Sequence, residues 1–165
     1  MWHHRTGPSP CGATRTCAAF RCQAGGVSRP ELAAALDLAP HPEGGWFRRT
    51  WTSPVTVDTP HGPRPSATAI LYLLDAPGRW HRVRSAEIWC RHLGEVELVL
   101  GGDGEEPGPG TVLLLGPPEP GGMRTLPQRE VPAGVWQRAS PLGDGPVLVS
   151  CVVSPGFDFD DFELR

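Results

Sequence analysis

The chain has 165 residues, of which 39% are hydrophobic, and this length allows one domain with a buried core. Its net charge of −3 is unevenly spread: residues 1–29 carry four Arg and no acid, whereas residues 30–165 carry eleven Arg and eighteen acids. An acidic body argues against nucleic-acid binding. No apolar run approaches the ~20 residues that span a bilayer, so we expect no membrane partner.

Glycine and proline are abundant, with 21 and 20 residues, and they separate short apolar runs. We interpret them as turn residues between strands, a pattern typical of an all-β sandwich or barrel. The five cysteines are odd in number and form no C-x-x-C pair, so they indicate no disulfide framework and favour a cytoplasmic location. Residues 1–28 are predicted to be a disordered basic N-terminal extension, and residues 29–165 the folded domain.

One short helix is predicted over Glu31–Asp37. It follows the sequence Ser28-Arg29-Pro30-Glu31, which has the form of a capping box, and it should end before Pro40. From Gly45 onward the apolar period changes to two, which is typical of strands.

The first of these strands places Trp46 and Arg48 on one face, and Phe47 and Arg49 on the other. A Pro-rich loop follows over residues 54–65. Further strands are expected at Ser66–Asp75, Trp80–Val83, Glu87–Leu93, Glu95–Leu100, Thr111–Leu115, Gln128–Val131, Val135–Ala139 and Val147–Val153, with a last one near Phe157–Phe162.

Two motifs contain residues that could take part in catalysis or bind a metal. His81 precedes Glu87 by six residues, and Glu87 precedes Gly94 by seven, which is close to H-x-H-x(3,4)-E-x(6)-G, the first motif of the cupins. The segment Pro132–Gln137 resembles their second motif, P-x-G-x-x-H. In metal cupins, the three His and the Glu of these motifs bind Fe, Mn, Ni or Zn inside the barrel.

Two of these four ligand positions differ in this chain, because Val83 replaces the second His and Gln137 replaces the third. Only His81 and Glu87 remain as strong donors, and two are usually too few for a tightly held metal.

Six segments together resemble the cupin-5 family, a group of uncharacterised-domain proteins of the cupin superfamily. They are His41–Arg48, Thr68–Ile70, His81–Ser85, Glu87–Trp89, Val131–Gln137 and Val153–Phe159. The resemblance implies an all-β double-stranded β-helix (a jelly roll), a homodimer, and a pocket like those of sugar epimerases, but no particular reaction. The chain departs from the family's usual residues at Arg49, Ala86 and Cys90, where Glu, Asp and His are common.

The residues that we predict to be catalytic are His81, Glu87 and Tyr72. Those predicted to bind substrate are Arg48, Trp89, Arg91, Trp136 and Gln137. We expect His81, Glu87 and Gln137 to meet inside the barrel. The pair His41 and Glu43, which precedes Gly44-Gly45, is interpreted as part of a structural turn.

Three functions remain open. The first is an isomerase or epimerase without a firmly held metal, in which His81 is the base, Glu87 orients it or acts as the acid, and Arg48 or Arg91 holds an anionic group. The second is a metal-dependent oxygenase or isomerase that holds Fe, Mn, Ni or Zn weakly through His81, Glu87 and Gln137. The third is a non-catalytic module that binds a small molecule.

Overall fold

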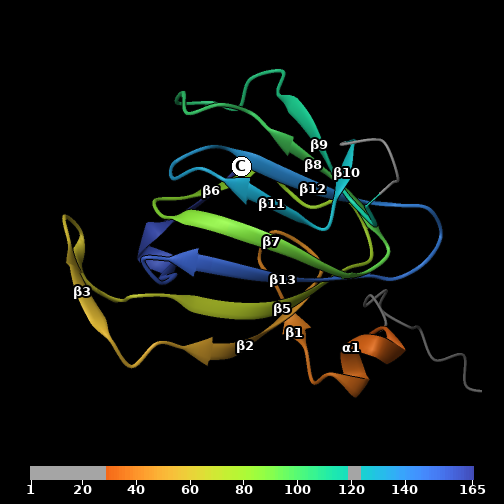
Figure 1. Ribbon diagram of the computed structural model, residues 1–165, viewed down its shortest axis with the longest axis horizontal. Coiled ribbons are helices and arrows are strands. Elements are labelled where there is room, and N and C mark those ends of the chain that lie inside the picture. Colours follow the sequence, from red (N-terminus) through yellow and green to blue (C-terminus); the bar gives the residue numbers. More distant parts are fainter. Residues whose placement is uncertain (1–28, 119–123) are drawn as a thin grey trace, which may run out of the picture.

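Two six-stranded sheets face each other in the computed structural model, which describes residues 29–118 and 124–165 (Figure 1). The first sheet has the order β1-β2-β5-β13-β7-β11, and the second has the order β10-β9-β8-β12-β6-β14. Strands make up 52% of the structure and most of them pair antiparallel, which confirms the predicted all-β double-stranded β-helix. The extension predicted over residues 1–28 lies outside the described residues.

The first sheet contains β1 (Ala39–Pro40), β2 (Trp46–Thr52), β5 (Thr68–Leu74), β7 (Ala86–Leu93), β11 (Gln128–Val131) and β13 (Val147–Ser154). The second contains β6 (His81–Val83), β8 (Glu95–Leu100), β9 (Thr111–Leu115), β10 (Thr125–Leu126), β12 (Gln137–Leu142) and β14 (Phe162–Leu164). The predicted bounds of β8, β9 and β11 are correct to the residue. The short strands β1 and β10 were not predicted.

The helix α1 (Glu31–Ala35) ends two residues earlier than predicted. Asp37 adopts a left-handed backbone conformation, with φ of 54°, which a helix cannot continue through. Pro30 is the N-cap and makes no side-chain cap, so it lies before the helix and not inside it. The Ser28 side chain of the predicted capping box lies outside the described residues. None of the described helices is long and apolar enough to cross a membrane.

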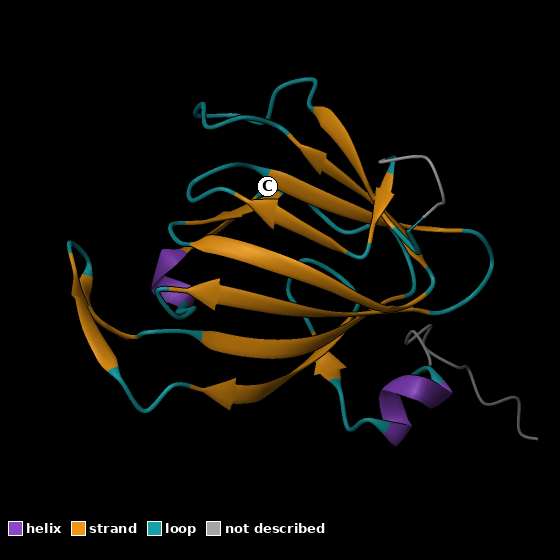
Figure 2. Ribbon diagram, in the orientation of Figure 1, coloured by secondary structure: helices purple, strands orange, loops and turns teal. Residues whose placement is uncertain are grey.

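The Pro-rich segment 54–65 is a hairpin and not only a loop. It contains β3 (Thr56–Thr59) and β4 (Gly62–Pro65), which pair with each other and extend from the body of the barrel (Figure 2). Its prolines are compatible with a two-stranded ribbon because Pro63 and Pro65 lie on an edge strand, where an N–H is dispensable.

The strand predicted near Phe157–Phe162 is wrong over most of its length. A 3₁₀ turn, η1 (Phe159–Asp161), occupies this segment, and β14 begins only at Phe162. The cause is local, because the carboxylate of Asp158 accepts a hydrogen bond from the N–H of Asp160 (3.0 Å) and so closes a turn. Asp161 is then held by Arg64 at 2.7 Å.

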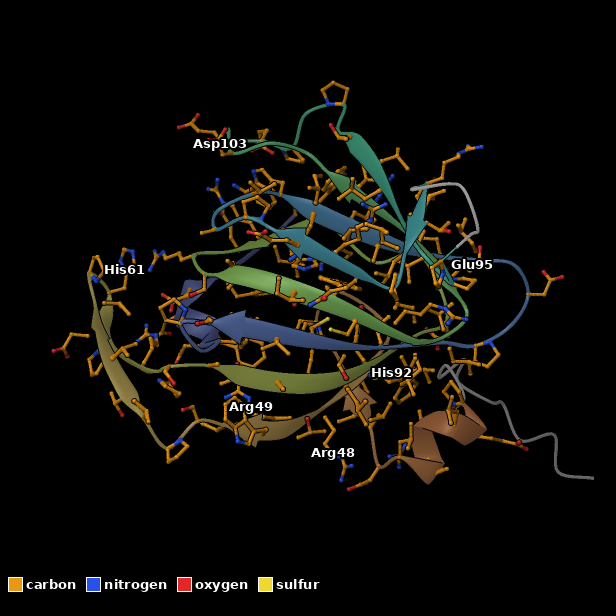
Figure 3. All side chains as sticks on the ribbon, in the orientation of Figure 1. Arg48, Arg49, His61, His92, Glu95 and Asp103 are labelled. Carbon is orange, nitrogen blue, oxygen red and sulfur yellow. The ribbon has the colours of Figure 1, made fainter. Side chains whose placement is uncertain are left out.

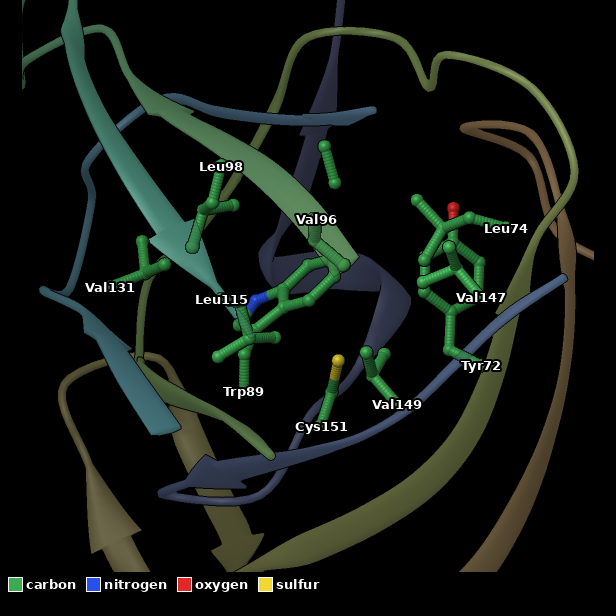
Figure 4. Packing of buried hydrophobic residues seen from close by; sticks show 11 residues of the cluster. Tyr72, Leu74, Trp89, Val96, Leu98, Leu115, Val131, Val147, Val149 and Cys151 are labelled. Carbon is green, nitrogen blue, oxygen red and sulfur yellow. The ribbon is translucent and has the colours of Figure 1, made fainter. Parts of the chain in front are cut away.

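The inward faces of the two sheets form one apolar core (Figure 4). Its members alternate with exposed or half-buried residues, most regularly along β13. The core includes Tyr72, Leu74, Trp89, Val96, Leu98, Leu115, Val131, Val147, Val149 and Cys151. A second cluster lies outside the barrel, where α1 and the following residues pack Ala33 and Leu38 against Trp46 and Leu73. The sheet that carries β2 and β5 is therefore apolar on both faces.

Gly45 lies where the chain enters β2, and we predict that it tolerates no side chain. Its φ is +68°, and an added Cβ would lie 2.5 Å from the carbonyl oxygen of Leu73. We expect Gly45→Ala to lower the free energy of unfolding by about 3 kcal/mol, from strain and overpacking together. Gly143→Ala is the control, because Gly143 has φ of +78° and no atom near its missing Cβ, so only about 1 kcal/mol is expected. Equal losses in urea denaturation would contradict this prediction.

Candidate active site

A narrow cavity lies between the inner faces of β2, β5, β7 and β13 on one side and β6 and β14 on the other. A water-sized group can occupy only ≈ 30 Å³ of it, so a ligand would place only a few atoms at its deep end in this conformation. Its wall is largely apolar and aromatic, and two histidines and two glutamates lie among these side chains. The lining residues are His41, Glu43, Phe47, Arg49, Thr68, Ile70, Tyr72, His81, Val83, Glu87, Trp89, Cys151, Val153, Phe157 and Phe162.

His81 enters the cavity from β6 and is only 4% exposed. Its Nδ1 lies 3.2 Å from the backbone oxygen of Arg79 and 3.0 Å from Oε2 of Glu43. A backbone oxygen can only accept a hydrogen bond, so these contacts assign the proton to Nδ1. Burial lowers the pKa of His81. The imidazole is therefore neutral at pH 7, and its Nε2 carries a lone pair.

Glu43 lies in the turn before β2 and is buried. Its Oε2 is 3.6 Å from Nδ1 of His41 and 3.0 Å from Nδ1 of His81. Burial raises the pKa of Glu43 to about 8, against the opposing effect of the Tyr72 hydroxyl, so the carboxyl is mostly protonated at neutral pH. Burial also lowers the pKa of His41 to about 4, and His81 adds to this effect. The three groups form a neutral cluster and not an ion pair.

The interpretation of His41 and Glu43 as only a structural turn is incomplete, because both line the cavity. One signal in the sequence could have identified them. Two titratable residues precede a Gly-Gly pair, and both glycines have positive φ, at 112° and 68°. Such a turn folds back sharply and can direct nearby side chains into the barrel.

Glu87 enters the cavity from β7, and a series of side-chain hydrogen bonds holds its carboxyl. The indole N–H of Trp89 can only donate, and it donates to Oε1 of Gln137 (3.0 Å). This contact turns the amide so that Nε2 of Gln137 donates to Oε2 of Glu87 (2.6 Å). Burial raises the pKa of Glu87, and the nearby His81 and the bond from Gln137 oppose the rise. Gln137 therefore fixes the orientation of Glu87.

The structure brings together the three residues that we expected to meet. Gln137 bonds to Glu87 and lies opposite His81 in the register of β12 with β6, and His81 and Glu87 line the same cavity. Tyr72 is also on the wall, where its hydroxyl donates to the carbonyl of Gly44 (2.8 Å). The catalytic roles assigned to these residues stay a prediction.

Of the predicted substrate-binding residues, only Trp89 lines the cavity, and Gln137 reaches it through its bond to Glu87, whereas Arg48, Arg91 and Trp136 lie elsewhere. Arg48 shares the outer face of β2 with Trp46, which packs under α1, whereas Arg49 is on the inner face with Phe47 (Figure 3). The predicted alternation was correct, and of the two arginines it is Arg49, and not the predicted Arg48, that lines the cavity.

Arg91 and Trp136 are occupied elsewhere. Nε of Arg91 donates to the carbonyl of Gly94 (2.6 Å), near the end of β7. Trp136 lies near two guanidinium groups, those of Arg82 and Arg165, at 4.6 and 5.2 Å from its ring centroid. Its N–H donates to the carbonyl of Gly104. Both side chains therefore stabilise the barrel away from the cavity.

The residues present do not fit the metal site that the motifs imply. Over residues 29–118 and 124–165, no group of three or more His, Cys, Asp or Glu side chains is placed to hold a metal ion. Gln137 does not complete the set, because its amide oxygen already accepts from Trp89 and its amide nitrogen donates to Glu87.

Comparison with known proteins identifies one family and several solved structures with the same fold. The family model described as Cupin superfamily (DUF985) matches residues 30–165. A solved protein from Shewanella oneidensis is 31% identical with a TM-score of 0.71, over 81% of this chain and 82% of that one. A hypothetical protein from Leishmania major is 33% identical with a TM-score of 0.68, over 79% and 83%.

More distant structures share the fold alone. Oxalate decarboxylase from Bacillus subtilis is 17% identical with a TM-score of 0.53, over 78% of this chain and 30% of its own. No curated protein matches this chain.

The buried carboxyl of Glu43 should make stability depend on pH. Its pKa is about 8 in the folded protein, against a model-peptide value of 4.5, so the folded state retains a proton that the unfolded state releases. Stability is then highest below pH 4.5 for this group and declines as the pH rises to 8. Between pH 6.5 and 8, we expect the free energy of unfolding to fall by about 1–2 kcal/mol more in wild type than in Glu43→Gln.

Urea denaturation at several pH values measures the effect. This window avoids His41, whose pKa is lowered to about 4 and whose contribution changes only below pH 6.5. The exposed Glu130→Gln is the control and should keep the wild-type pH dependence. The same slope in wild type and Glu43→Gln would show that Glu43 is ionised in the folded protein.

Proposed function

This chain belongs to the Cupin superfamily (DUF985) family, and we propose that it is a small-molecule enzyme of isomerase or epimerase type, which moves a proton inside its barrel cavity. One observation carries the proposal. His81 is buried, its Nδ1 contacts the backbone oxygen of Arg79 and Oε2 of Glu43, and its Nε2 lone pair is left for a ligand in a cavity that also contains the buried carboxyl of Glu87.

The roles of the two carboxyls follow from their contacts. Glu43 contacts Nδ1 of His81, so its carboxyl, which is mostly protonated at neutral pH, orients the imidazole. Glu87 does not accept from His81 in the structure, and its Oε2 accepts from Gln137. When Glu87 is protonated, its proton is then on Oε1, so Glu87 is the acid.

The proposed reaction starts from a substrate with a C–H bond next to a carbonyl group. Nε2 of His81 removes the proton from carbon, while the carboxyl of Glu87 gives its proton to the carbonyl oxygen, which yields an enol. Return of a proton to carbon, and of the enol proton to Glu87, restores both groups. Return to the other face gives an epimer. If the C–H carbon also carries a hydroxyl group, the enol is an enediol; loss of that hydroxyl proton to a base and return of a proton to the former carbonyl carbon then gives an isomer. The electrons and protons balance without any further reactant.

Hydrogen–deuterium exchange tests this chemistry without knowledge of the physiological substrate. The protein is incubated in D₂O with small ketones, aldoses and oxo acids, and loss of the C–H signals is followed by NMR. We expect exchange by wild type, and at least about 100-fold slower exchange by His81→Ala and by Glu87→Gln. His92→Ala is the control, because this side chain is exposed on the outer face of β7, where it contacts Ser150.

The outcomes separate the three functions. Unchanged exchange in His81→Ala would refute the acid–base site. Loss of activity on chelation, with recovery on addition of Fe, Mn, Ni or Zn, would favour the metal-dependent enzyme. Ligand binding by native mass spectrometry, without exchange of any compound, would favour the binding module.

A further inference from the structure

Arg49 is the only arginine among the described residues that line the cavity. β2 places it two residues after Phe47, on the inner face, and the register of β2 with β5 shifts just after it, between Arg49 and Trp51. Such bulges bend a strand and redirect its side chains. Arg49 is exposed, whereas His81 is 4% exposed, so the guanidinium marks the mouth of the cavity and His81 its deep end.

Most of the guanidinium is available to a ligand. Nη2 donates to the carbonyl of Phe157 (3.1 Å), and the carbon of the guanidinium lies 5.8 Å from the centre of the Phe157 ring. None of the ion pairs in the described part of the chain involves Arg49. A guanidinium has five N–H donors, so four remain after the bond to Phe157.

The other side chains of the cavity wall indicate what the rest of a ligand would be. Aromatic rings from four strands and the C-terminal segment surround the space between Arg49 and His81, namely Phe47, Tyr72, Trp89, Phe157 and Phe162. This wall favours a short apolar chain over one rich in hydroxyls. Burial raises the pKa of Glu43 to about 8, so this carboxyl is mostly protonated at neutral pH and does not repel an anion.

From this arrangement we infer that the substrate is a small oxo acid, whose carboxylate is held by Arg49 at the mouth while its ketone reaches His81 and Glu87. The inference rests on the proposed function for the reacting end, but the role of Arg49 stands on its own geometry. A carboxylate fits better than a phosphate, because one guanidinium balances one negative charge and its paired N–H groups match two oxygens.

The probes are 4-oxopentanoate, its uncharged analogue 4-oxopentanamide, and 3-oxobutyl phosphate, each titrated into the full-length protein and followed by ligand-observed NMR. We expect wild type to bind the carboxylate about tenfold or more tightly than the amide. Arg49→Gln should lose this preference without weaker binding of the amide, and Arg49→Lys should keep part of it. Arg48→Gln is the matched control, because it removes the neighbouring arginine from the outer face and should bind as wild type does.

Each other outcome overturns the inference. Equal binding of acid and amide by wild type, or a preference that survives in Arg49→Gln, would mean that Arg49 does not hold the anion. Tighter binding of the phosphate would reject the carboxylate, and no binding of any probe would reject small oxo acids as the class. His81→Ala should keep the preference for the acid while it loses exchange. Acid binding through Arg49 with no exchange in wild type would refute the proposed reaction alone.

Discussion

The contact between the imidazole of His81 and the carboxyl of Glu43 joins two segments that are far apart in the sequence. Glu43 lies in the turn before β2, and His81 begins β6 in the opposite sheet. Two hydrogen bonds hold the turn that carries Glu43, since the N–H of Arg79 donates to the carbonyl of Glu43 (2.8 Å) and the hydroxyl of Tyr72 donates to the carbonyl of Gly44. The base is thus oriented by a turn that is itself bonded to the segment just before β6.

Burial decides the protonation of the site. His41 and His81 are neutral and Glu43 is mostly protonated near pH 7, because burial lowers the pKa of both imidazoles and raises the pKa of Glu43 to about 8. Burial also raises the pKa of Glu87. A neutral imidazole and a protonated carboxyl are the forms that a base and an acid require before a proton transfer. Gln137, which Trp89 holds in place, orients Glu87 with an uncharged amide donor, and this bond opposes part of the rise in the pKa of Glu87.

The sequence predicted the parts of the site that depend on strand alternation. The period-two pattern of β7 correctly placed Glu87 and Trp89 on one face. The same pattern in β2 separated Arg48 from Arg49 but could not identify the inner one, because apolar residues lie on both faces of this sheet. Trp46 packs under α1 on the outer face, and Phe47 lies on the cavity wall. Only the position of the helix settles that choice.

His41 and Glu43 were missed for a different reason. They lie in a turn, where side-chain direction follows from backbone angles and distant contacts and not from a period. The 3₁₀ turn near the C-terminus was missed for a similar reason, because the carboxylate of Asp158 favours a turn within a segment whose pattern is typical of a strand. Local side-chain bonds of this kind override the apolar pattern.

The protonation of His81 is the central claim, and nitrogen NMR measures it directly. In ¹⁵N-labelled protein at pH 7, two-bond ¹H–¹⁵N correlations distinguish the two neutral forms of an imidazole from the charged form, and His81→Ala identifies the signals. We predict a neutral ring with the proton on Nδ1 and an unprotonated Nε2. A charged ring at pH 7, or a neutral ring with its proton on Nε2, would contradict the account, because Nε2 could then not act as the base.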